Sequence, residues 1–138
     1  MAQRPPALDR RAVMLSRGLP LLAYLILIFV VSAQPHLKAP FDFPNSDKLW
    51  HMAEYGGLGA LVTRLLRSLN DWRLRPGLIA LAVLLCSANG AADERFQSTV
   101  PGRESSVYDW AADTVGATLG ALAYARIVRN RAGEATWL

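Results

Sequence analysis

Four apolar stretches alternate with short polar segments along the 138-residue chain. Residues 18–33 contain no charge, and long apolar runs recur within 47–66, 77–97 and 106–128. Each stretch approaches or reaches the roughly 20 residues with which an α-helix crosses a hydrocarbon core of about 30 Å. The connecting segments contain the prolines and clustered charges that end helices. The pattern predicts an all-α polytopic membrane protein, built as a bundle of four transmembrane helices.

The first apolar stretch has two interpretations. Residues 1–17 contain two prolines and no apolar run, and they predict a mostly disordered basic leader with arginines at positions 4, 10, 11 and 17. Such a leader, the apolar run and Val31-Ser32-Ala33 also describe a secretory signal peptide with a small-residue cleavage site. We favour a retained helix, because it places every basic cluster on the same side of the membrane.

Basic residues are unevenly distributed among the polar segments. Eleven of the 15 Lys and Arg residues lie in the leader, in the turn after the second span, and at the end of the fourth span and in the tail at 129–138. The excess of Lys and Arg in cytoplasmic segments then places both termini in the cytoplasm. We therefore expect a multi-pass protein of the cytoplasmic (inner) membrane, with the lipid bilayer as its surroundings and the other two connecting segments facing outward.

The composition excludes some classes of protein. A net charge of +4 is compatible with nucleic-acid binding, but the arginines separate apolar segments and do not form one basic face. Without the apolar segments too little chain remains for a folded domain, so we expect no nucleic-acid partner. Cys86 is the one cysteine, which excludes an intramolecular disulfide. The small size leaves a homo-oligomer open.

Polar residues collect at the outward ends of three spans. In the second span Asp47, His51, Glu54 and Tyr55 share one helix face, with Lys48 close by. The third ends with Asn89, Asp93, Glu94 and Gln97, and the fourth carries Ser106, Asp109, Asp113, Gly116 and Gly120 on one stripe. Ionisable groups at membrane depth need partners and usually serve a function. Two features also have purely structural interpretations: Ser106 and Asp109 fit a helix cap, and Gly116-x-x-x-Gly120 permits close helix packing.

These residues suggest a polar pocket at the outer leaflet. Candidate acid or base residues are Glu94, Asp109 and His51, and candidate ligand-binding residues are Asp47, Lys48, Tyr55, Gln97, Arg103, Ser106 and Asp113. Lys48 and Arg103 could hold a phosphate or carboxylate, but carboxylates outnumber the basic groups, so a basic group or a divalent cation fits better.

The expected chemistry of this pocket is limited. We expect no cofactor and no metal, since zinc prefers more histidines than the chain has here; a hard cation on Asp and Glu oxygens is the alternative. No activated serine or cysteine motif is present, and whether the protein is an enzyme stays open.

Two motifs together carry a family resemblance. Asp47-Lys48-x-x-His51-x-x-x-Tyr55 is followed by Asp93-Glu94-x-x-Gln97-x-x-x-Pro101-Gly102-Arg103 and by Ser106-x-x-Asp109-x-x-x-Asp113-x-x-Gly116-x-x-x-Gly120. In this order they resemble the VanZ-like family of small bacterial membrane proteins. The resemblance implies membrane topology and a cell-envelope context, and the family's name implies a link to teicoplanin resistance. That family typically has asparagine where this chain has Asp113.

Three functions are compatible with these residues. The first is an envelope protein that binds or modifies a cell-wall or lipid-linked component in the response to glycopeptide antibiotics. The second is a small proton-coupled carrier that uses Glu54, His51, Glu94 and Asp109. The third is a structural protein whose polar residues only hold helix ends together, for example through Lys48 with Asp93 or Glu94, and Arg103 with Asp109.

Overall fold

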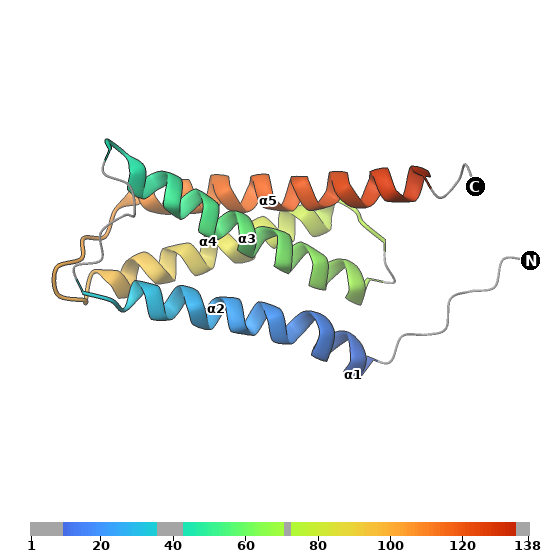
Figure 1. Ribbon diagram of the computed structural model, residues 1–138, viewed down its shortest axis with the longest axis horizontal. Coiled ribbons are helices and arrows are strands. Elements are labelled where there is room, and N and C mark those ends of the chain that lie inside the picture. Colours follow the sequence, from blue (N-terminus) through green and yellow to red (C-terminus); the bar gives the residue numbers. More distant parts are fainter. Residues whose placement is uncertain (1–9, 36–42, 71–72, 135–138) are drawn as a thin grey trace, which may run out of the picture.

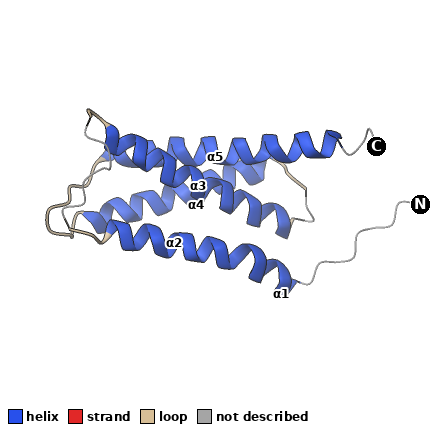
Figure 2. Cartoon of the chain, viewed as in Figure 1, coloured by secondary structure: helices blue, strands red, loops and turns tan. Residues whose placement is uncertain are grey.

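The computed structural model describes residues 10–35, 43–70 and 73–134, and these residues form a bundle of helices (Figure 1). The elements are α1 (Arg10–Val13), the π-helical turn η1 (Met14–Gly18), α2 (Leu19–Ser32), α3 (Ser46–Leu69), α4 (Pro76–Gln97) and α5 (Val107–Glu134). Because α1, η1 and α2 follow one another without a break, the bundle consists of four long helices. The described residues contain no strand (Figure 2), which confirms the all-α prediction.

The first and last helices extend beyond the predicted spans. The helical path begins at Arg10, inside the segment that we expected to be a disordered leader, and α5 continues past Val128 to Glu134. The physical reason is that arginine is a good helix former, whose apolar stem can lie along a helix while its guanidinium reaches water. Charge alone therefore did not mark the ends of these helices. Residues 1–9 and 135–138 of the predicted leader and tail lie outside the described residues.

Local sequence accounts for where α4 and α5 begin. Pro76 occupies the first turn of α4, where a missing backbone N–H costs no hydrogen bond. At the start of α5 the Ser106 hydroxyl accepts hydrogen bonds from the backbone N–H groups of Tyr108 (3.2 Å) and Asp109 (3.4 Å). Ser106 is therefore the helix cap that its spacing to Asp109 allowed.

Helices α3 and α5 form the most extensive contact in the bundle. A Cβ atom added at Gly116 would collide with the backbone of Met52, and one added at Gly120 would collide with the backbone of Gly56. On the other helix, a Cβ atom at Gly59 would meet the backbone of Ala117. The two backbones are thus in direct contact, as the Gly-x-x-x-Gly pattern predicts.

Many large apolar side chains lie on the surface of the bundle, and several charged side chains lie inside it. Apolar side chains such as Phe29 (56% exposed) and Leu84 (67% exposed) face outward, while Glu94 (5%) and Asp113 (0%) lie inside. In water such a surface would be a large apolar patch, but it matches a lipid environment. Among the described residues, two helices are long and apolar enough to cross a membrane, Arg11–Ser32 and Pro76–Gln97. The two apolar helices indicate a membrane protein.

Candidate functional site

A group of polar side chains, here called the polar cluster, occupies one end of the bundle. At this end α2 and α4 finish while α3 and α5 begin (Figure 1). The cluster consists of Ser32, Lys48, His51, Asp93, Glu94, Gln97, Arg103, Asp109 and Asp113. Polar residues from separate helices thus meet at one place, as the sequence pattern predicted.

The deepest contact of the polar cluster joins α3 to α5. Nδ1 of His51 lies 2.8 Å from Oδ1 of Asp113, and both residues are buried. The second carboxylate oxygen of Asp113, Oδ2, is buried without a hydrogen-bond partner. Gly116 contacts Met52, the residue next to His51, so the close approach of the two backbones brings this pair together.

Lys48 forms a second link between the same helices, nearer the surface. Its ammonium donates to Asp47 at 2.9 Å and to Asp109 at 3.1 Å. The side chain of Asp47 is 51% exposed and that of Asp109 is 13% exposed, so Asp47 lies at the rim and Asp109 faces the interior. The expectation that Lys48 pairs with Asp93 or Glu94 was therefore wrong, because the rotation of α3 turns Lys48 toward α5.

A chain of hydrogen bonds connects α2, α4 and the turn that follows α4. Oδ2 of Asp93 accepts from the Ser32 hydroxyl at 2.8 Å and from the Gln97 amide at 2.8 Å. The guanidinium of Arg103 donates to the Gln97 side-chain oxygen. The expected pairing of Arg103 with Asp109 was wrong, since the turn after α4 directs Arg103 back to Gln97, the last residue of α4.

Glu94 lies between the hydrogen bonds around Asp93 and the contacts that join α3 to α5. Its Oε2 accepts a hydrogen bond from the Ser106 backbone N–H at 2.7 Å, while Oε1 is buried and has no partner. One ligand atom each from Glu94, His51 and Asp109 lie within 4.8 Å of one another. An imidazole and two carboxylates at this separation could hold a divalent cation. These three residues are the predicted acid or base candidates, so the structure brings them together.

The remaining predicted residue, Tyr55, lies deeper in the bundle. It is fully buried, and its hydroxyl accepts a hydrogen bond from the Asn89 amide at 3.0 Å. Tyr55 therefore packs α3 against α4 below the polar cluster.

Ser32 is the cluster residue that the sequence did not reveal. It is 2% exposed and hydrogen-bonded to Asp93, but in the sequence it stands in an apolar run that resembles a signal peptide. A polar residue in the last turn of an otherwise apolar helix was the available signal.

A family model described as VanZ/LLP1 matches residues 24–129. The matched range contains every residue of the polar cluster and most of the bundle. A comparison with curated proteins and a comparison with solved structures each find no match.

Proposed function

Because this chain belongs to the VanZ/LLP1 family, we propose that it is a four-span receptor for a cell-envelope component. In this proposal a cationic group of the component, such as a primary amine, enters the polar cluster from the outer leaflet. The observation that carries the proposal is the pair of buried oxygens without partners, Oε1 of Glu94 and Oδ2 of Asp113. Leaving a buried acceptor unsatisfied costs about 1–3 kcal/mol, so a ligand that donates hydrogen bonds there would gain affinity.

The charges of the polar cluster favour a cationic ligand over an anionic one. Beside His51, the polar cluster contains four carboxylates, those of Asp93, Glu94, Asp109 and Asp113, and two basic side chains, Lys48 and Arg103. An ammonium group has three donors and no acceptor. It would therefore supply a positive charge and donate hydrogen bonds to Oε1 of Glu94 and Oδ2 of Asp113, which lack a partner.

The distribution of basic residues supports an outward-facing cluster. Arg64, Arg67 and Arg131 lie on the parts of α3 and α5 that are remote from the polar cluster. If that basic end faces the cytoplasm, the polar cluster faces the envelope. This orientation makes an envelope component accessible and agrees with a role in the response to glycopeptide antibiotics.

Binding can be tested on the full chain in detergent, with dodecylamine as the probe and dodecanol as the uncharged control. We expect the wild type to bind the amine and not the alcohol, and Glu94→Gln to bind it about tenfold more weakly, which corresponds to about 1.4 kcal/mol. Glu104→Gln is the matched control, because Glu104 is exposed in the turn between α4 and α5. Equal binding by all three proteins would contradict the role of the cluster.

The antibiotic role needs a separate measurement in cells. Expression of the wild type in a susceptible Gram-positive host should raise the teicoplanin concentration that inhibits growth. Glu94→Gln should lose this effect at equal protein level, while Glu104→Gln should keep it. An unchanged inhibitory concentration with the wild type would refute the antibiotic role and leave amine binding to be decided by the first experiment.

A structural role of the cluster is distinguished by a double replacement. Lys48 and Asp109 pair across α3 and α5, and a pair can be replaced by apolar residues without loss of stability. If the pair only holds the helices together, Lys48→Met with Asp109→Leu should preserve amine binding. If Asp109 contacts the ligand, the double variant should fold normally and bind the amine at least tenfold more weakly.

A further inference from the structure

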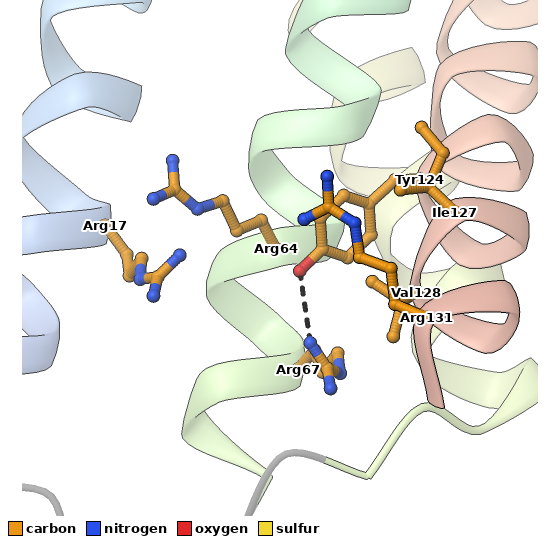
Figure 3. A pocket seen from close by; sticks show the side chains of 7 residues that line it. All are labelled: Arg17, Arg64, Arg67, Tyr124, Ile127, Val128 and Arg131. Carbon is orange, nitrogen blue, oxygen red and sulfur yellow. Dashed lines mark hydrogen bonds between the residues drawn. The ribbon is translucent and has the colours of Figure 1, made fainter. Parts of the chain in front are cut away.

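A basic cavity lies away from the polar cluster, between the first helix, α3 and α5 (Figure 3). Its volume is about 500 Å³, and it is lined by Arg17, Arg64, Arg67, Tyr124, Ile127, Val128 and Arg131. The arginines come from three elements: η1 contributes one, α3 two and α5 one. Among the lining residues that the structure describes, none is an Asp or a Glu.

The side chains converge on a shared space. Arg17 and Arg64 extend toward each other from η1 and α3, and Arg131 extends from α5 toward α3 (Figure 3). Nη1 of Arg67 lies 3.5 Å from the Tyr124 hydroxyl, to which it donates. Several guanidinium groups around one cavity repel each other, so an anion bound between them would relieve this repulsion.

Helix-end electrostatics do not explain the whole arrangement. Arg67 and Arg131 lie in the last turns of α3 and α5, where a cation is favourable beside the helix dipole. Arg17 is the eighth residue of the first helix and Arg64 lies more than one turn before the end of α3, so neither charge is stabilised by a helix-end dipole. An anion in the cavity would be stabilised by these two arginines as well as by those at the helix ends.

We propose that this cavity binds a phosphate group, carried by the headgroup of an anionic lipid. Arginine presents paired N–H donors that match two phosphate oxygens, and basic pockets between membrane helices bind lipid phosphates. The apolar part of the lining favours an amphiphile over a free ion: Ile127, beside the arginines, is 52% exposed. The cavity shares no residue with the polar cluster, so this inference does not depend on the proposed function.

The test uses the full chain in nanodiscs or detergent and compares phosphatidylglycerol with phosphatidylcholine, by counting bound lipids in native mass spectrometry. We expect the wild type to bind phosphatidylglycerol at least tenfold more tightly than phosphatidylcholine. Arg64→Gln with Arg131→Gln should lose this preference. Arg126→Gln with Arg129→Gln is the matched control, because it removes the same charge from exposed positions of α5 that do not line the cavity.

A second arm separates a lipid from a soluble phosphate. Inorganic phosphate or glycerol phosphate that displaces phosphatidylglycerol from the wild type at millimolar concentration would support phosphate binding and assign the source to a soluble molecule. Equal loss in the cavity variant and in the control variant, or no preference in the wild type, would overturn the proposal. If the glutamine variant fails to fold, a second variant, Arg64→Lys with Arg131→Lys, keeps the charge and removes the paired donors. This variant should bind phosphatidylglycerol several-fold more weakly than the wild type. Unchanged binding would count against the proposal.

Discussion

Gly116→Ala should destabilise the bundle by forcing α3 and α5 apart. The added Cβ would meet backbone atoms of Met52 inside the 3.0 Å that real Cβ atoms essentially never cross. A flexible side chain could move aside, but a backbone can yield only if the whole helix shifts. Inserting a methyl group into a close-packed contact typically costs about 1–3 kcal/mol, and the contact between two backbones favours the upper half of that range.

The same shift should weaken the polar cluster. His51 is adjacent to Met52, and its hydrogen bond to Asp113 spans the widened interface at 2.8 Å. A displacement of roughly 1 Å would stretch this contact beyond the distance at which a hydrogen bond persists. We therefore expect Gly116→Ala to lower both the melting temperature and the affinity for the amine probe.

Thermal unfolding in detergent, followed by tryptophan fluorescence, provides the measurement. A loss of about 1–3 kcal/mol corresponds to a fall of about 3–9 °C for a chain of this size. Gly77→Ala is the matched control, because a Cβ there meets nothing within 4 Å, and alanine restricts the unfolded chain more than glycine does. Gly77→Ala should therefore melt at or above the wild-type temperature. If Gly116→Ala and Gly77→Ala melt at the same temperature, the backbones of α3 and α5 are not in direct contact at Gly116.

Two further predictions concern single contacts, and a third concerns the orientation of the protein in the membrane. Asp113→Asn should stay within about 1 kcal/mol of the wild type, because it keeps an acceptor for His51, whereas Asp113→Leu should cost about 1–3 kcal/mol; equal thermal losses would contradict this. Ser32→Ala should lower stability by about 1–3 kcal/mol through its lost bond to Asp93, while Ser98→Ala at an exposed site should have a smaller effect on melting. With Cys86→Ala as background, an impermeant maleimide on intact cells should label Ser98→Cys and not Arg73→Cys; the reverse pattern would place the polar cluster in the cytoplasm.

The sequence pattern predicted the helices because their signals are local. An uncharged run such as 18–33 specifies a helix in lipid, whatever the rest of the chain does. The prediction failed at Arg10, because the charges of the leader led us to expect disorder, whereas the backbone is helical from this residue on. Arginine has a high helix propensity. Charges next to a membrane helix indicate where lipid ends, and the helix itself can continue into water.

Residue spacing identified most members of the polar cluster, with the exception of Ser32, but not their partners. Spacings of three, four and seven residues place side chains on one face of one helix. Whether Lys48 meets Asp109 or Glu94 depends on the rotation of α3 against its neighbours, which no local pattern contains. Arg103 shows the same limit, because a turn rather than a helix determines its direction.

The basic cavity depends on two separate features of the chain: the distribution of its arginines and the packing of its helices. The distribution of arginines among the polar segments predicted which helix ends lie on the same side of the membrane. That prediction does not depend on how the four helices pack against each other. Their convergence on one cavity requires in addition that α3 and α5 lie in direct contact, so that Arg64 and Arg131 reach the same space. That contact is the one made by Gly116 and Gly120. Gly116 and Gly120 therefore support both ends of the bundle. A variant that separates α3 from α5 should weaken both amine binding at the polar cluster and phosphate binding at the basic cavity.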